Sequence, residues 1–124
     1  ASIADYLRFH CGCPIVQAPG DAAFALVGSV DCLPRLERFA TGSAEYPDRS
    51  ATIITELPHL TGGSSTVLTG PGIATTRDFD PVGLPDWFWS AWAVNHGGFP
   101  LGIDAIFTCG SEFCALPRST KGEA

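Results

Sequence analysis

The segment from Ala51 to Leu57 constrains the fold most strongly, because it reads Ala-Thr-Ile-Ile-Thr-Glu-Leu. A β-branched and mostly apolar run of this kind is typical of a strand that is buried on both faces of a sheet. The strand is predicted to end at Pro58, since proline cannot donate a hydrogen bond to a neighbouring strand. A strand buried on both faces requires a sheet with a layer above it and a layer below it.

The rest of the chain alternates short strands with helical segments. Apolar spacing predicts helices over 3–10 and 84–96, and Asp31, Pro34 and Gly42 are typical of a helix over 31–42. Short strands are predicted over 22–27, 66–69, 103–108 and 113–116. The polar turn at 61–65 is expected to join the strands on either side of it as a hairpin, as is Gly110-Ser111. The predicted fold class is therefore α/β, with a mixed sheet and helices on both faces.

Length and charge narrow the class of protein. With 124 residues, 45% hydrophobic and 16% charged, the chain is predicted to form a single domain over residues 1–124. A net charge of -6 repels nucleic acid and anionic membranes, so neither is expected as a partner. Helical spacing begins at Ile3 with no strong cap before it. We therefore expect the chain to be the C-terminal part of a longer subunit whose upstream segment is absent.

Lysine and cysteine usage argues against several kinds of chemistry. Lys121 is the only lysine and lies in a tail that is expected to fray, which argues against Schiff-base catalysis. The five cysteines have no framework spacing, which suits reduced thiols in the cytoplasm. The segment His10-Cys11-Gly12-Cys13 lacks the wider cysteine spacing and the second ligand pair of a zinc site. No metal site is therefore predicted.

Several polar side chains lie next to the predicted strands and helices. Asp104 enters an apolar strand, where a carboxylate must be paired or functional, and Arg118 leaves the last strand. Because arginine forks suit carboxylates and phosphates, we expect Asp104 to pair with an arginine. His59 and His96 are candidate general bases, but neither has an orienting carboxylate close to it in the sequence. The dipole at a helix C-terminus favours a positively charged side chain there, which is a sufficient structural reason for a histidine at position 96.

The helix predicted over 84–96 carries the tryptophans Trp87, Trp89 and Trp92 and is apolar almost all round. Such a helix is either buried between two layers or part of a subunit interface, where aromatic side chains concentrate binding energy. Both alternatives remain open from the sequence.

Five motifs follow one another along the chain in a fixed order. They are Leu7-Arg8-Phe9-His10, Leu68-Thr69-Gly70-Pro71-Gly72-Ile73, Phe99-Pro100-Leu101-Gly102-Ile103-Asp104, Thr108-Cys109-Gly110 and Leu116-Pro117-Arg118-Ser119-Thr120. In this order they resemble the PhnH family, the H subunit of the bacterial carbon-phosphorus lyase core complex, over essentially the whole chain. The resemblance implies a fold similar to the large domain of pyridoxal-phosphate-dependent transferases, without that cofactor and with no other cofactor of its own.

The same resemblance implies a role in phosphonate metabolism. Family members are cytosolic, dimer-forming subunits that work with the G, I and J subunits of the pathway. The G, H and I proteins are linked to coupling an alkylphosphonate to the ribose of ATP with loss of adenine, and the J subunit later cleaves the carbon-phosphorus bond. The expected partners are therefore a second copy of the chain and these other subunits.

Two hypotheses of different classes follow. In the first, the chain is a non-catalytic subunit that docks through apolar surface, with Trp87, Trp89 and Trp92 as candidate interface residues. In the second, the chain binds a nucleotide or phosphonate itself in an anion pocket. That pocket would contain Arg8, His10, Thr69, Gly70, Gly72, Asp104 and Arg118. The two hypotheses differ in whether Arg8, Asp104 and Arg118 surround one cleft.

Overall fold

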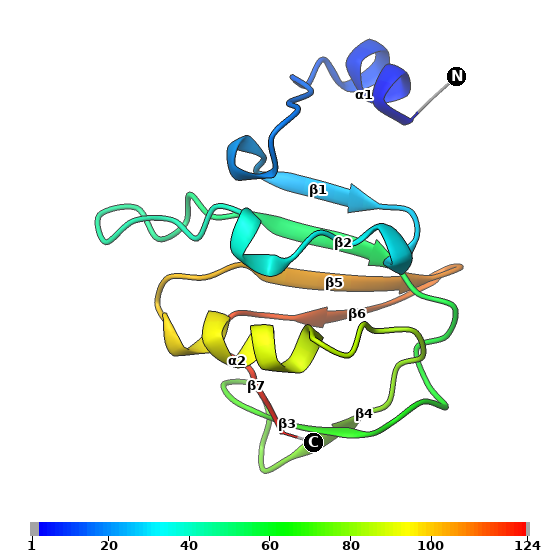
Figure 1. The fold of residues 1–124 in the computed structure, drawn as a ribbon, viewed down its shortest axis with the longest axis vertical. Helices are drawn as coiled ribbons and strands as arrows, with labels where there is room; N and C mark the ends of the chain where they lie inside the picture. The colour runs from blue at the N-terminus through cyan, green and yellow to red at the C-terminus, as the bar shows by residue number, and fades with distance from the viewer. Residues whose placement is uncertain (1–2, 124) are drawn as a thin grey trace.

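The computed structural model describes residues 3–123, which form two α-helices and seven strands arranged in two sheets (Figure 1). The helices are α1 (Ile3–Cys11) and α2 (Phe88–Gly97). The strands are β1 (Phe24–Val27), β2 (Thr52–Glu56), β3 (Thr66–Thr69), β4 (Arg77–Phe79), β5 (Asp104–Cys109), β6 (Glu112–Leu116) and β7 (Lys121–Glu123). The α/β class and the mixed sheet predicted from the sequence are confirmed.

The larger sheet has four strands in the order β1-β2-β5-β6. Strands β1, β2 and β5 run parallel, and β6 returns antiparallel to β5 across the Gly110-Ser111 turn. The closing hairpin is therefore confirmed. The central strand β2 lies between β1 and β5, which agrees with the apolar character of its sequence.

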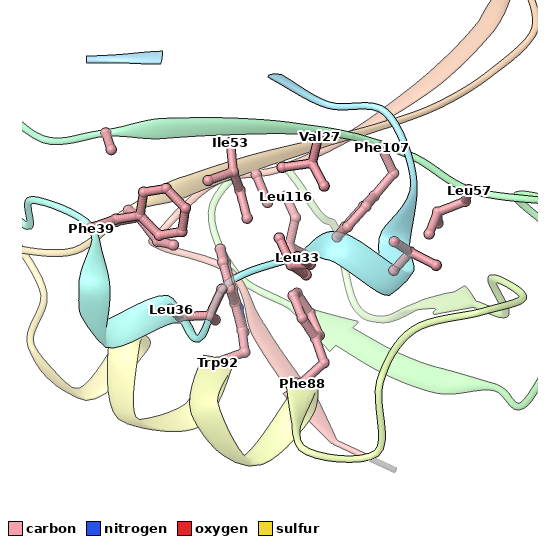
Figure 2. Close-up of a cluster of buried hydrophobic side chains, with 14 of the residues drawn as sticks. Val27, Leu33, Leu36, Phe39, Ile53, Leu57, Phe88, Trp92, Phe107 and Leu116 are labelled. Carbon is pink, nitrogen blue, oxygen red and sulfur yellow. The ribbon is translucent and has the colours of Figure 1, made fainter. Parts of the chain in front are cut away.

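The core lies between the four-stranded sheet and α2 (Figure 2). Phe88 and Trp92 of α2 are 0% exposed, and their rings stack with centroids 5.9 Å apart. Phe88 also meets Phe107 of β5 edge to face at 5.7 Å. Ile53 and Thr55 of β2 point to this side and are fully buried. The tryptophan helix is thus the layer that covers one face of the sheet.

The opposite face of the sheet is open over residues 3–123. Thr52 and Ile54 of β2 are only half-buried, so this strand is buried on one face rather than on both. Helix α1 has no buried residue and lies beyond β1, away from both faces (Figure 1). Within this part of the chain, the prediction of helices on both faces is therefore not met.

The second sheet has three antiparallel strands in the order β4-β3-β7. The hairpin predicted across 61–65 is wrong, because β3 pairs with β4 and β7 and not with β2. The physical reason is that both edges of β2 are already occupied by β1 and β5. The prediction of a frayed tail is also wrong, since Lys121–Glu123 forms β7.

The helix predicted over 31–42 is wrong as well. This segment contains two single 3-10 turns, Val30–Cys32 and Leu36–Arg38. Pro34 disfavours the helical conformation of the residue before it, and Leu33 accordingly has φ -65° and ψ 117°. The apolar side chains of the segment are still buried, with Leu36 at 4% exposure, so their burial does not require a helix.

Candidate functional site

Asp104 and Arg118 form the most connected polar cluster of the described chain. The backbone N–H of Arg118 donates to Oδ1 of Asp104 at 2.7 Å, and the side-chain Nε donates to the same oxygen at 3.1 Å. Nη2 of Arg118 donates to Oδ2 of Asp104 at 2.6 Å. The predicted pairing of Asp104 with an arginine is therefore observed, in the two-pronged geometry that arginine favours with a carboxylate.

The other side of the guanidinium is also occupied. Nη1 of Arg118 donates to the carbonyl oxygen of Pro47 at 2.7 Å, and Nη2 donates to Oγ of Ser50 as well. All three nitrogens of the Arg118 guanidinium thus have protein acceptors. This arginine joins the loop before β2 to the start of β5.

Charge and hydrogen bonding shift the pKa values of both partners. Burial alone would raise the pKa of Asp104, but the hydrogen bonds and the charge of Arg118 together lower it below its usual value. The hydrogen bond to Asp104 raises the pKa of Arg118 further, against a smaller opposing effect of burial. Both side chains are therefore held in their charged forms.

The cluster lies at the amino end of the parallel strands. Asp104 is the first residue of β5, and Ser50 comes two residues before β2. Open α/β sheets bind ligands outside the carboxyl ends of their strands, which is the opposite edge. The position of the pair and the four hydrogen bonds of the guanidinium together indicate that Asp104 and Arg118 act as a structural clip.

Arg8 and His10 lie on α1, away from this cluster (Figure 1). Arg8 pairs with Asp5 one turn earlier at 3.6 Å, and both side chains are more than half exposed. The ring of His10 lies 4.4 Å from that of Tyr6 and 4.9 Å from that of Phe9. The structure therefore does not bring these two residues together with Asp104 and Arg118.

Thr69, Gly70 and Gly72 belong to the turn that follows β3. Gly70 has φ 145°, and a Cβ atom there would lie 2.9 Å from the carbonyl oxygen of Ser119. Only glycine permits this close approach to the residue after Arg118. The turn thus packs against the backbone beyond Arg118, while the Arg118 side chain itself is engaged by Asp104.

A cavity of about 450 Å³ lies between this turn, β4 and β6. Its lining includes Gly72, Ile73 and Phe113, together with the charged side chains of Arg77, Asp78 and Asp80. Sequence reasoning missed Arg77, because β4 has only three residues and gives no clear strand pattern. The register Leu68↔Arg77 places Arg77 on the same face of its sheet as the buried Leu68.

Cys114 of β6 also lines this cavity. Burial raises the pKa of the Cys114 thiol, and the positive charge of Arg77 lowers it in part. Asp80, another lining residue, accepts a hydrogen bond from the backbone N–H of Gly62 at 3.0 Å. The cavity therefore holds charges of both signs beside a protonated thiol.

The three tryptophans have different environments. Trp92 is 0% exposed, and its Nε1–H donates to the carbonyl oxygen of Thr120 at 2.9 Å, so it has no surface to offer a partner. Trp87 is half-buried, with the guanidinium of Arg35 over its ring at 4.7 Å. Trp89 is half-buried and meets Phe79 edge to face at 6.2 Å. A role in a subunit interface therefore stays a prediction for Trp87 and Trp89, whereas the buried Trp92 cannot contact a partner.

The outer side of α2 borders a second cavity, of about 350 Å³. Ala91 and Val94 contribute from the helix, and Leu36 and Leu101 contribute from neighbouring segments. Val94 is 79% exposed. The exposed apolar surface of α2 is therefore centred on Val94 and not on the tryptophans.

Both histidine candidates have structural surroundings. Nδ1 of His96 lies 3.1 Å from the carbonyl oxygen of Arg118, which ties the end of α2 to the C-terminal segment. His59 is exposed and forms an isolated backbone bridge with Val82. Neither environment supplies a carboxylate hydrogen bond to orient a general base.

The five cysteines are free thiols, and Sγ of Cys13 donates to the carbonyl oxygen of Leu7 at 3.6 Å. Over residues 3–123, no three histidine, cysteine or acidic side chains are grouped so that they could hold a metal ion. In the same range, neither helix is long and apolar enough to cross a bilayer.

Comparison with known proteins identifies two relatives that match most of the chain. "Alpha-D-ribose 1-methylphosphonate 5-triphosphate synthase subunit PhnH" of Rhizobium meliloti (strain 1021) is 37% identical over 123 residues, which are 99% of this chain and 62% of the relative. "Putative C-P lyase subunit protein HtxG" of Stutzerimonas stutzeri is 33% identical over 91 residues, which are 73% of this chain and 44% of the relative. The chain thus spans less than two-thirds of the length of either relative. The family model described as "Bacterial phosphonate metabolism protein (PhnH)" matches residues 1–123, so the chain belongs to the PhnH family.

Proposed function

We propose that this chain serves the synthesis of ribose 1-methylphosphonate 5-triphosphate from ATP and methylphosphonate, as a non-catalytic, dimer-forming subunit. The observation that carries the proposal is the 37% identity, over 99% of the chain, to a protein named as a subunit of that synthase. In this role the chain joins the G, I and J subunits of the cytoplasmic carbon-phosphorus lyase system. Its contribution is assembly, and the chemistry of the reaction belongs to its partners.

The arrangement of the candidate ligand residues supports a docking role. An anion-binding arginine must keep donors free for its ligand, whereas four of the five N–H donors of the Arg118 guanidinium already have protein acceptors. Arg8 lies on α1 and pairs with Asp5. The residues expected to surround one anion are therefore divided between separate parts of the fold.

The exposed side of α2 supports the same role. Val94, 79% exposed, stands beside the cavity lined by Ala91 and Leu101, and Phe99 just after the helix is 56% exposed. Apolar side chains around a shallow cavity are typical of the centre of a protein interface. We assign this patch, defined by Ala91, Val94 and Leu101, as the candidate surface for a partner subunit.

Light scattering on mixtures of the chain with the G, I and J subunits tests the proposal. Co-elution without ATP or methylphosphonate is expected, with loss of co-elution in Val94→Glu. Val16→Glu is the matched control, because Val16 is exposed at 43% but lies far from α2 in the sequence. Retained assembly of Val94→Glu would exclude this patch, and failure of the unsubstituted chain to join the subunits would contradict the docking role.

A second candidate function is supported by the cavity beside β4. Arg77 lines it together with Gly72 of the turn after β3, and in residues 3–123 the structure records no ion pair of its guanidinium. A free arginine fork beside backbone amides suits a phosphate or phosphonate group. In this alternative, the chain binds a nucleotide or phosphonate there and not at Arg118.

Thermal unfolding with ATP or methylphosphonate distinguishes the two functions. Binding in the cavity raises the melting temperature, and Arg77→Gln removes the increase, while Arg38→Gln, at another exposed arginine, leaves it unchanged. No change in melting temperature with either ligand, together with ligand-free assembly, supports the docking function alone.

The proposal extends to the architecture of the complete subunit. We propose that residues 1–124 are the C-terminal part of a longer chain whose whole fold resembles the large domain of pyridoxal-phosphate-dependent transferases. The parallel order β1-β2-β5 and the greater length of both relatives support this extension. Lys121, the only lysine in the sequence, is exposed and pairs with Glu123 at 2.9 Å.

A further inference from the structure

The last residue pair between β2 and β5, at the carboxyl ends of these parallel strands, begins a row of three different side chains. The register pairs Glu56 of β2 with Thr108 of β5, and Thr108 with Phe113 of β6. Directly paired side chains lie on the same face of a sheet, and neighbouring strands are about 4.8 Å apart. A carboxylate, a hydroxyl and an aromatic ring thus lie side by side. We call these three residues the rim row.

The rim row points away from the core and lies at the end of the sheet. Thr55 and Phe107, each one residue before a member of the row, are 0% exposed on the side that α2 covers. Because side chains alternate along a strand, Glu56 and Thr108 point to the other face. Glu56 is exposed, Thr108 is half-buried and Phe113 is 72% exposed. The row is therefore accessible at the edge where open α/β sheets bind ligands, outside the carboxyl ends of their strands (Figure 1).

The carboxylate of Glu56 is held in place but keeps room for further hydrogen bonds. Oγ1 of Thr108 donates to Oε2 of Glu56 at 2.6 Å, and the backbone N–H of Gly110 donates to Oε1 at 3.3 Å. Each carboxylate oxygen can accept about two hydrogen bonds, so each has one acceptor position left. The ion pairs recorded over residues 3–123 do not include Glu56. The hydroxyl of Thr108 gives its hydrogen to Glu56, so it also acts as an acceptor toward a ligand.

Phe113 gives the rim row an aromatic end. Its exposed ring also lines the cavity beside β4, which Arg77 lines as well. Exposed aromatic side chains act as platforms on which nucleic acid bases stack, because every base has a π-face. Methylphosphonate has neither a ring nor adjacent hydroxyl groups, so it does not match this row. Neighbouring acceptors beside an aromatic ring match a nucleoside, whose ribose donates hydrogen bonds through adjacent hydroxyls.

We propose that the rim row binds the nucleoside part of a nucleotide, with Glu56 and Thr108 on the ribose hydroxyls and Phe113 against the base. In dinucleotide-binding sheets an acidic side chain likewise accepts hydrogen bonds from the ribose. The inference rests on the second candidate function above, in which the chain binds a nucleotide or a phosphonate, and it selects the nucleotide. The phosphates are left to Arg77, which lines the same cavity as Phe113.

Isothermal titration of the unsubstituted chain with two nucleosides tests the proposal. Adenosine has both ribose hydroxyls and no phosphate, whereas 2′,3′-dideoxyadenosine has the same base without these hydroxyls. We expect adenosine to bind at least about tenfold more tightly, which is the size of effect given by hydrogen bonds to a charged group. Because neither compound carries a phosphate, Arg77 does not contribute to the difference. Equal affinities, or no binding of adenosine, overturn the proposal.

Variants assign the difference in affinity to the rim row. Glu56→Ala is expected to reduce the affinity for adenosine to that for the dideoxy compound, which itself stays unchanged. Glu112→Ala is the matched control, because Glu112 is also exposed at this end of the sheet but pairs with Cys109 and points to the opposite face. Phe113→Leu weakens both nucleosides by the same factor, and Phe113→Tyr restores them. Urea midpoints verify that each variant is folded, and a preference for adenosine that survives Glu56→Ala overturns the proposal.

The outcomes also separate this inference from the function on which it rests. Thermal stabilisation by ATP that depends on Arg77, without binding of adenosine, overturns the role of the rim row and leaves the second candidate function intact. Stabilisation by methylphosphonate, with no binding of ATP or adenosine, assigns the cavity to a phosphonate and likewise overturns the inference. If none of the three compounds binds, both the inference and the second candidate function are wrong.

Discussion

The carboxylate of Asp104 accepts three hydrogen bonds from Arg118, at 2.7 Å from the backbone N–H, 3.1 Å from Nε and 2.6 Å from Nη2. One residue begins β5 and the other follows the end of its hairpin partner β6. The pair therefore closes the hairpin at its open end. Through Pro47 and Ser50 the same guanidinium also fixes the loop before β2.

Removal of this arginine should destabilise the fold. Arg118→Ala leaves the partly buried carboxylate of Asp104 without its charged donors, which costs on the order of 2 kcal/mol of unfolding free energy. Urea denaturation followed by tryptophan fluorescence measures the loss. Arg38→Ala, at an exposed arginine with no recorded ion pair among residues 3–123, is the control and should be nearly neutral. An equal effect of both substitutions would show that the pair of Asp104 and Arg118 contributes nothing to the free energy of unfolding.

The acid limit of stability should depend on Asp104. The pKa of Asp104 is lower in the folded protein than in the unfolded chain. Its contribution to the free energy of unfolding is therefore fully present above the pKa of the unfolded state, and it is lost as the pH falls through the pKa of the folded state. Asp104→Asn removes this ionisation, so the fall in stability below about pH 4 should become shallower than in the unsubstituted chain. Urea midpoints measured from pH 2 to pH 7 give the comparison, and parallel curves would exclude Asp104 as the source.

Reactivity should differ strongly among the cysteines. Burial raises the pKa of Cys114 and limits the access of a reagent to its thiol, whereas Cys32 is exposed, so iodoacetamide should modify Cys114 more slowly than Cys32 at pH 8. Arg77→Gln removes the charge that partly offsets the rise in pKa, so the rate at Cys114 should fall further. Peptide mass spectrometry follows both sites, and the rate at Cys32 serves as the internal control.

Gly63 should tolerate no side chain. A Cβ atom there would lie 2.1 Å from the carbonyl oxygen of Pro81, a backbone atom that cannot move aside easily. Gly63→Ala should therefore lower the melting temperature by several degrees or more, as expected for a loss above about 1 kcal/mol. Gly28→Ala is the control, because nothing lies within 4 Å of the added methyl group there. Equal melting temperatures of Gly63→Ala and Gly28→Ala would contradict the close contact between Gly63 and Pro81.

The indole of Trp92 should hold the C-terminal strand in place. Trp92→Phe keeps an aromatic ring in the core but removes the hydrogen bond to Thr120, at a cost of about 1 kcal/mol. Amide exchange in β7 and in the facing residues of β3 should accelerate before the rest of the sheet is affected. Trp87→Phe is the matched control, because no hydrogen bond of its indole to β7 is recorded. Unchanged exchange in β7 after Trp92→Phe would rule out this role.

Local patterns predicted the elements whose neighbours are close in sequence. The β5-β6 hairpin follows from alternation and a two-residue turn, and α2 follows from a long apolar run that ends in glycine. The short strands β4 and β7 were missed, since three residues each carry little signal and both depend on pairing with β3. Pairing between distant segments is decided by which strand edges remain free, and a sequence pattern does not contain that information.

In the candidate site too, contacts within a local segment could be predicted from the sequence, whereas contacts between distant segments could not. The pairing of Asp104 with an arginine was predicted from the cost of an unpaired carboxylate at the entry of an apolar strand. The additional hydrogen bonds of Arg118 were not predictable, because Pro47 and Ser50 come from a distant loop and one of them contributes a backbone oxygen. Arg77 was overlooked for a similar reason, since the cavity beside it is made by strands from different parts of the chain.

The placement of β7 means that the antiparallel sheet depends on a segment that is synthesised well after its neighbours. Strand β3 (Thr66–Thr69) is translated before its second neighbour, β7 (Lys121–Glu123). Until that segment has been made, the Trp92 indole has no Thr120 carbonyl to accept its hydrogen bond, and the Trp89 ring lacks its contact with Gly122. The nascent chain can pair β1 with β2 before that point. Its antiparallel sheet is completed only once residues 121–123 have left the ribosome.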